Sequence, residues 1–188
     1  MRKLIVGISA VLMLLTLSGR PAGAWGTEQQ QVPCDFVTGG GFIVGRGGSD
    51  LQAGAHGNFG VGGGVKNGAF WGHLEYNDHG SSPLRTVHGT SVTGYSQSSS
   101  CLGTSGPTRD ITGTCQINQT VDCTYIVRVT DNGEPGANHD EFSIRVMVGG
   151  SVVYQAGTCF GDGPIVGGNM QVHKGNASNT PPSGFTCE

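Results

Sequence analysis

The chain has 188 residues, with 10 Lys and Arg against 13 Asp and Glu, a formal net charge of −3, and 35 glycines. A slightly acidic chain with scattered cations lacks the basic patches that nucleic acid or an anionic membrane surface requires, so neither partner is expected. The glycines show no Gly-X-Y period, which excludes collagen.

Residues 1–24 carry the pattern of a cleaved signal peptide. Arg2 and Lys3 precede an apolar stretch over 4–17, and small residues follow it. The stretch is shorter than the ~20 residues of a spanning helix, so no membrane span is expected. The mature chain should begin at Trp25, with its net charge lowered from −3 to about −6 by the loss of three cations. This predicts a secreted or extracellular protein (periplasmic in a Gram-negative host).

The rest of the chain has the length of one domain. We expect a flexible, Gln-rich arm over 25–33 and a single β-domain over 34–174. The tail over 175–188 is polar and ends next to Cys187, which suggests that this cysteine fastens the tail to the body, to either Cys34 or Cys159.

The first half of the domain contains a strong hairpin signal. Residues 34–44 form an expected strand interrupted by three glycines, which mark a bulge or a close backbone approach. Residues 58–66 and 69–77 then flank Asn67-Gly68, and Asn-Gly between alternating runs is typical of a two-residue hairpin turn. The runs 84–88 and 90–95 that follow are either a strand pair or one bent strand.

The strand 69–77 provides the first candidate site. Leu74 and Tyr76 share one face, and Trp71, His73 and Glu75 share the other. An exposed Trp beside polar groups can grip a sugar or a protein surface, because its ring combines apolar area with a polar handle. The alternation leaves open whether a second sheet covers this face and makes Trp71 part of the core.

Two alternating runs in the second half predict another hairpin. Ile117 and Val121 end these runs, and a three-residue loop over 118–120 would place Cys115 directly opposite Cys123. Opposed Cβ atoms lie within disulfide range, and export to an oxidising compartment favours the bridge over two separate thiols. Cys34, Cys101, Cys159 and Cys187 complete an even set whose pairing the spacing does not determine.

Further strands complete the domain. The run 142–148 alternates apolar residues with Glu141, Ser143, Arg145 and Met147, and a turn of two or three residues at Gly149-Gly150 leads to the run 152–154. The last strand is expected over 165–173. About ten short strands and no helical periodicity predict an all-β fold, either an antiparallel β-sandwich or a barrel-like jelly roll.

A second candidate site lies in the loop DNGEPGANHD. Asp131, Asn132, Glu134 and Asp140 supply oxygens within one short segment, as a calcium ion requires. The same residue types also favour a tight β-connection for conformational reasons alone. No cofactor is therefore expected, and calcium at this loop is kept as the alternative to a purely structural role.

A family resemblance comes from several motifs in order: CDFVTGGGFI, NFGVGGGVKNGAFWGHLEYND, VHGTSVTGY, DNGEPGANHDEFSIRV and GGNMQVH. Together they cover about 34–174 and resemble the post-COAP family of bacterial exported domains. The resemblance implies an extracellular β-domain of surface or secreted proteins and brings no catalytic residues. The many cysteines and the loop around Cys101 depart from the barest pattern of the family.

Two functions follow from these observations. The first is a secreted, disulfide-stabilised, non-catalytic module that binds an extracellular glycan or a surface protein, or has a structural role, at the bacterial cell surface. The second is a small secreted carbohydrate-active enzyme with Glu75 and Asp78 as its carboxylates. Carboxylates on a protein surface are common, and no metal or nucleophile motif accompanies these two, so the non-catalytic module is preferred.

Overall fold

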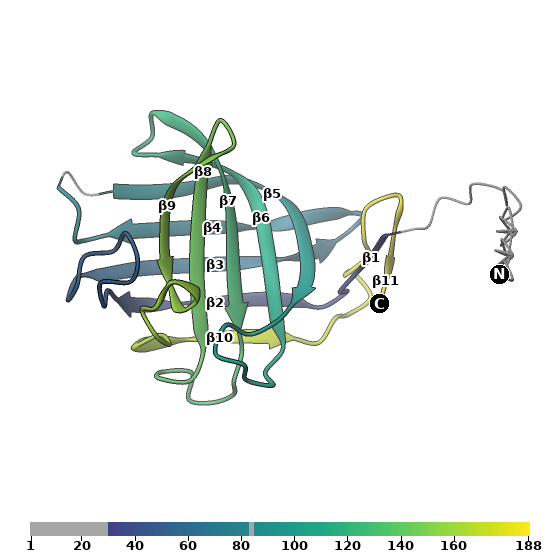
Figure 1. Cartoon of the computed structure of the whole chain (residues 1–188). Coiled ribbons are helices and arrows are strands. Elements are labelled where there is room, and N and C mark those ends of the chain that lie inside the picture. The colour runs from purple at the N-terminus through teal and green to yellow at the C-terminus, as the bar shows by residue number, and fades with distance from the viewer. Residues whose placement is uncertain (1–29, 83–84) are drawn as a thin grey trace, which may run out of the picture.

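The computed structural model describes residues 30–82 and 85–188, and the expected signal peptide lies outside them. Apart from one short 3₁₀ helix, all regular structure described is strand, which confirms the all-β prediction. The elements are β1 (Gln30–Val32), β2 (Phe36–Val44), β3 (His56–Lys66), β4 (Ala69–Asp78), β5 (Arg85–Ser98), β6 (Thr108–Ile117), β7 (Val121–Thr130), β8 (Glu141–Val148), β9 (Ser151–Gly157), η1 (Thr158–Phe160), β10 (Gly167–His173) and β11 (Phe185–Cys187) (Figure 1).

Nine of these strands form a single curled antiparallel sheet in the order β10-β2-β3-β4-β5-β6-β7-β8-β9. In Figure 1, β10 and β2–β4 form one layer and run across β6–β9, which form the other. β5 joins the layers, and its register with β6 shifts between Gly89 and Ser91 and between Val92 and Gly94. Such bulges bend a strand so that it can serve two layers. The runs before and after residue 89 are therefore one bent strand.

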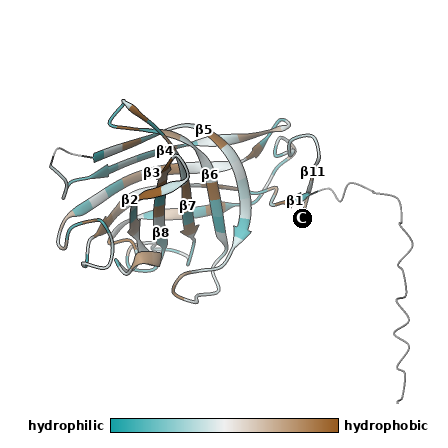
Figure 2. Cartoon of the chain, turned by 45° about the horizontal axis from the view of Figure 1, so that its top comes forward, coloured by the Kyte–Doolittle hydropathy of each residue, from teal (hydrophilic) through white to brown (hydrophobic). Residues whose placement is uncertain are grey.

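The core lies between the two layers. Val61 and Leu74 of the first layer and Val127 and Ile144 of the second are fully buried. Figure 2 shows the corresponding alternation of hydrophobic and hydrophilic bands along the strands. Aromatic rings join the layers: Phe59 of β3 stacks on Phe142 of β8 with 3.8 Å between ring centroids. Because each strand contributes alternate residues, the opposite positions remain available on the two outer faces.

The predicted hairpin turns are confirmed. β3 and β4 are joined by Asn67-Gly68, whose φ angles of 50° and 78° suit the twist of the flanking strands. The loop over 118–120 has three residues, since Ile117 pairs with Val121. The β8–β9 turn has two residues, Gly149-Gly150, because Val148 pairs with Ser151.

Three disulfides link the chain: Cys34–Cys187, Cys101–Cys159 and Cys115–Cys123. The predicted pair on the β6–β7 hairpin is confirmed, with the two residues directly opposite in register. The expected flexible arm is partly wrong, because Gln30–Val32 is a strand. It pairs in parallel with β11, beside the Cys34–Cys187 bridge that holds the tail. Gln30–Val32 has no alternating pattern of its own, so its order comes from this distant partner.

Carboxylates accept hydrogen bonds from backbone amides on the outer edge of β9, the last strand of the sheet. Asp50 accepts from the Gln155 amide at 2.7 Å, and Asp162 accepts from the Gly157 amide at 2.7 Å. Unpaired edge amides invite pairing with other chains, and a carboxylate that accepts from them blocks that pairing.

Candidate functional site

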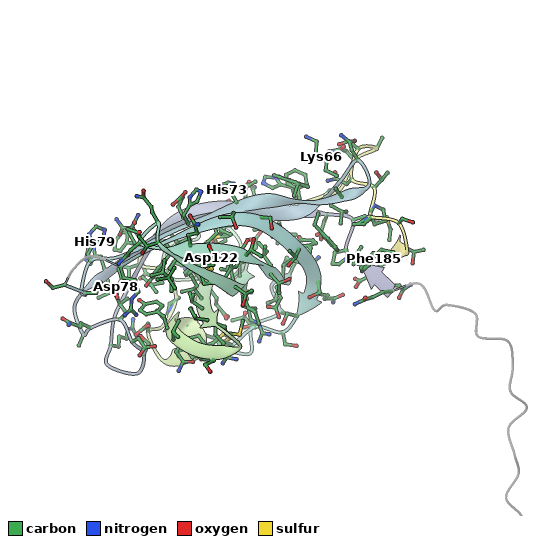
Figure 3. All side chains as sticks on the ribbon, turned by 90° about the horizontal axis from the view of Figure 1, so that it is seen from above. Lys66, His73, Asp78, His79, Asp122 and Phe185 are labelled. Atoms are coloured by element: carbon green, nitrogen blue, oxygen red, sulfur yellow. A yellow bond between two sulfur atoms is a disulfide. The ribbon has the colours of Figure 1, made fainter. Side chains whose placement is uncertain are left out.

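The structure places Trp71, His73 and Glu75 on the outer face of β4. His73 and Glu75 are exposed and Trp71 is half-buried, whereas Leu74 and Tyr76 between them are fully buried. Figure 3 shows His73 projecting away from the body of the molecule. Among residues 30–82 and 85–188, no second sheet covers this face, because the two layers of the curled sheet pack through their opposite faces.

Glycines line the middle of this outer face, where Gly60 is half-buried and Gly62 and Gly64 are buried beneath neighbouring side chains. Gly60, Gly62 and Gly64 occupy three successive outward positions of β3 and lie opposite Glu75, His73 and Trp71 in register. A Cβ at position 62 would lie 3.2 Å from the His73 ring, and one at 64 would lie 2.7 Å from the Phe36 Cβ. The missing side chains therefore let neighbouring rings lean over the β3 backbone. We call this the glycine strip.

An aromatic cluster stands at one end of the glycine strip. It consists of His173 of β10, Phe36 of β2 and Trp71 of β4. The His173 and Phe36 rings stack with centroids 4.6 Å apart, and the Phe36 and Trp71 rings lie 6.0 Å apart. The Lys66 ammonium lies 5.9 Å from the Trp71 ring centre, and the Trp71 indole N–H is buried without a hydrogen-bond partner. The cluster offers apolar ring area next to a cation.

A polar cavity of about 620 Å³ adjoins the other end of the strip. Glu75 bonds His88 of β5 across its mouth, and both side chains are more than half exposed. The remaining walls carry amide and hydroxyl groups with both donors and acceptors, which suit a ligand rich in hydroxyl groups. They are Asn77, Thr86, Gln116 and Gln119.

The proposed catalytic pair of Glu75 and Asp78 does not form. Glu75 is on the outer face, while Asp78 is 2% exposed and accepts from the Gly80 amide and the Tyr154 hydroxyl. Residues three apart on a strand point to opposite faces, so these carboxylates cannot act on one bond. Tyr154 also bonds Tyr76 at 2.8 Å. Burial raises the pKa of both phenols, so both tyrosines stay protonated in the core.

The acidic loop over 131–140 binds β10, the outermost strand at one edge of the sheet. Asp140 accepts from the Met170 amide at 2.8 Å and Asp131 accepts from the Val172 amide at 2.9 Å, so both bind β10. With Asp50 and Asp162, which bind β9 in the same way, these residues form a set that we call the edge aspartates.

The loop also bonds within itself and to β10 through its other polar groups. The second oxygen of Asp140 accepts from the Asn132 amide, and the second oxygen of Asp131 accepts from the Gly133 amide. Glu134 accepts from the Asn169 side chain at 2.7 Å. Each carboxylate therefore already has a structural partner.

Calcium binding by this loop stays a prediction. Within residues 30–82 and 85–188, no group of three or more His, Cys, Asp or Glu side chains is placed to hold a metal. A calcium site would raise the melting temperature at millimolar calcium by mass action, and Glu134→Gln, an exposed change, should abolish that rise. An unchanged melting temperature would leave the loop as an edge fastening only. Differential scanning calorimetry with calcium and with a chelator distinguishes these results.

Sequence reasoning did not identify His88, Phe36 and His173 as neighbours of the β4 residues. The alternation around Val87 places His88 on an outer face, but it does not say that β5 pairs with β4. His173 reaches Phe36 because β10 pairs with β2, a contact between segments more than 100 residues apart. Only the order of strands in the sheet brings these side chains together.

Comparisons with protein-family models, curated proteins and solved structures gave no match. The resemblance to the post-COAP family therefore stays a prediction. In the described part of the chain, no helix has the length and apolar character to cross a bilayer. The fold and the site thus define an antiparallel, disulfide-stabilised β module, and its role is argued from its surface.

Proposed function

We propose that this chain is a secreted, non-catalytic module that binds an extracellular glycan across the outer face of β2–β5. The observation that carries the proposal is the continuity of this face: aromatic cluster, glycine strip and polar cavity follow one another along β4. Trp71 and Glu75 are four residues apart on one strand, which corresponds to about 13 Å. Three disulfides support a location in an oxidising compartment.

The chemistry of this face suits a neutral sugar chain better than a protein partner. The cavity offers side-chain amides and hydroxyls that pair with sugar hydroxyls, and the rings offer flat apolar area to the sugar C–H groups. Specific protein interfaces usually have a large apolar centre, whereas the centre of this face is glycine backbone beneath the neighbouring His73 and Phe36 side chains. The face therefore suits an extended polymer of small, polar units.

A glycan array followed by calorimetry tests the proposal. We expect at least one neutral oligosaccharide to bind. Trp71→Ala should lower its affinity roughly tenfold or more, because the indole ring that would stack on the sugar is lost. Gln116→Ala and Glu75→Gln should weaken binding less and leave the melting temperature within about 2 °C, because both side chains lie at the surface.

The matched controls are Gln52→Ala and Val153→Thr, which change exposed side chains away from this face. Both should bind as the unaltered chain does. Unchanged affinity in all three site variants, or no glycan bound by the unaltered chain, would refute the proposal. Release of reducing ends from a bound glycan would instead favour a carbohydrate-active enzyme.

A further inference from the structure

A second concave site lies on the outer face of the opposite layer, away from the glycan-binding face. It is a groove of about 300 Å³ over β6, β7 and β8, with η1 along one side. Ile126 contributes apolar floor, and Phe160 forms part of the wall. Polar groups line the rest: Asp110, Arg128, Ser143, Arg145 and the backbone around Cys159.

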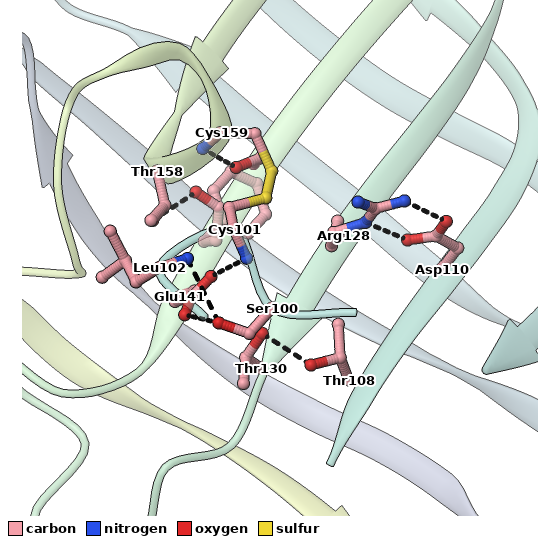
Figure 4. The surroundings of a disulfide bond; sticks show 12 residues. Ser100, Cys101, Leu102, Thr108, Asp110, Arg128, Thr130, Glu141, Thr158 and Cys159 are labelled. Atoms are coloured by element: carbon pink, nitrogen blue, oxygen red, sulfur yellow. Dashed lines mark hydrogen bonds and ion pairs between the residues drawn. A yellow bond between two sulfur atoms is a disulfide. The ribbon is translucent and has the colours of Figure 1, made fainter. Parts of the chain in front are cut away.

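The wall of the groove is held in place by covalent and polar contacts. The Cys101–Cys159 disulfide ties η1 to the loop that follows β5, and the Cys159 amide donates to Ser143 Oγ at 2.8 Å (Figure 4). On the loop side, the buried Glu141 accepts from the Cys101 amide at 2.8 Å and from the Ser100 hydroxyl. Ser143 and Glu141 are outward on β8, yet these contacts bury them. A site fixed in this way loses little conformational entropy when a ligand binds.

The groove carries one unpaired cation, Arg145, in a chain whose net charge is negative. Arg128 donates two parallel hydrogen bonds of 2.8 Å to the Asp110 carboxylate, so the charges of these two side chains neutralise each other. Arg145 is exposed and stacks its guanidinium over Phe160, 5.3 Å from the ring centre. Arg145 takes part in none of the three ion pairs among the described residues. Its donors therefore remain free for a ligand.

We infer that this groove binds a carboxylate-bearing sugar, such as a uronic acid unit of an acidic polysaccharide. Arg145 can bind the carboxylate with two donors, since a guanidinium matches that geometry. The neighbouring Asp110 and Arg128 present an acceptor beside a donor, which suits adjacent hydroxyl groups. Ile126 and Phe160 cover the apolar face of the sugar ring. This site is separate from the neutral-glycan face and does not depend on it.

A peptide carboxylate is the less favoured ligand. Proteins commonly capture a chain terminus with a nest of successive backbone amides, and this groove uses side chains instead. A terminal carboxylate also carries no donor for the Asp110 oxygens. The acidic sugar engages both Arg145 and the Asp110–Arg128 pair.

The test is a nuclear magnetic resonance titration of the disulfide-bonded chain with sodium glucuronate. We expect shifts of the Ile126 methyl and Phe160 ring signals, no comparable shifts with glucose, and at least a tenfold weaker affinity in Arg145→Gln. Lys174→Gln, which removes an exposed cation elsewhere, should bind glucuronate as the unaltered chain does.

Several outcomes would overturn the inference. These are an absence of shifts at Ile126 and Phe160, equal shifts with glucose, and unchanged affinity in Arg145→Gln. Equal or tighter binding of N-acetyl-glycyl-glycine would assign the groove to a peptide carboxylate instead. Ile126 and Phe160 line the groove over β6–β8, and Trp71 lies on the other layer. A failure of glucuronate binding is therefore distinguishable from a failure of neutral-glycan binding at Trp71.

Discussion

Replacing both cysteines of the Cys34–Cys187 bridge with alanine should lower the free energy of unfolding by about 5 kcal/mol, the largest effect expected of any single disulfide. The bridge closes a loop between residues 153 apart in sequence. In the chain-entropy description, the stabilisation by a disulfide grows with the logarithm of the loop length. The unfolded chain that lacks this bridge gains correspondingly more freedom.

The tail that this bridge holds makes specific contacts with the β3–β4 hairpin. The Asn67 amide donates to the Ser178 carbonyl at 2.8 Å, and the buried Asn179 side chain donates to the Val65 carbonyl at 2.8 Å. Phe185 of β11 packs edge-on against Phe70 of β4. We therefore expect these contacts to loosen in the double variant, which protease digestion of the tail would detect.

The Cys115–Cys123 pair provides the matched control. Its residues are only 8 apart and already paired within one hairpin, so the same double alanine change should cost about half as much, roughly 2.5 kcal/mol. Guanidinium denaturation of both variants measures the difference. Equal losses would contradict the loop-length explanation and would indicate that local packing at each bridge dominates.

Asp140→Ala should lower the free energy of unfolding by about 2–6 kcal/mol. Asp140 is fully buried and accepts from two amides, those of Met170 and Asn132. Removal of the carboxylate leaves both amides without a partner, and each such loss costs about 1–3 kcal/mol. The effect should concentrate at β10, so hydrogen exchange of the Met170 amide should accelerate more than that of β7 amides.

Asp122→Ala is the control for this change, because Asp122 is exposed and only bonds the Gln116 side chain. It should alter stability by less than about 0.5 kcal/mol. Similar losses in both variants, or unchanged exchange at Met170, would show that β10 does not depend on the Asp140 carboxylate.

The pH dependence of stability gives an independent measurement at the same residue. Burial raises the pKa of Asp140, although its two backbone hydrogen bonds favour the charged form. The folded chain thus binds this proton more tightly than the unfolded chain, so the contribution of Asp140 to stability falls as pH rises through the window between the two pKa values. Relative to Asp140→Asn, the unaltered chain should gain stability as pH falls from about 7 to about 4.

Local patterns in the sequence were enough to predict the hairpins and one disulfide. The alternation of apolar and polar residues gives the face of the sheet to which each side chain points. The turn at Asn67-Gly68 sets the register between β3 and β4, and the three-residue loop at 118–120 sets it between β6 and β7. Cys115 and Cys123 could be paired on this basis alone. The orientation of Trp71, His73 and Glu75 follows from the same rule.

Contacts between distant strands could not be predicted in this way. Alternation does not say that β10 pairs with β2, or that β5 bends between two layers, because those choices depend on packing of the whole sheet. The groove containing Arg145 exists because Cys101 pairs with Cys159, one of several possible pairings. The outward Glu141 and Ser143 likewise became buried through a loop far away in sequence.

The edge aspartates have a consequence for how this module can be packed. Asp131 and Asp140 accept hydrogen bonds from backbone amides of β10, one outermost strand. Asp50 and Asp162 do the same for β9, the other outermost strand. Fibrils grow when such a strand offers its backbone to an identical neighbour. Because carboxylates of the same chain interrupt both growth points, cross-β stacking through these two strands is disfavoured even at high protein concentration.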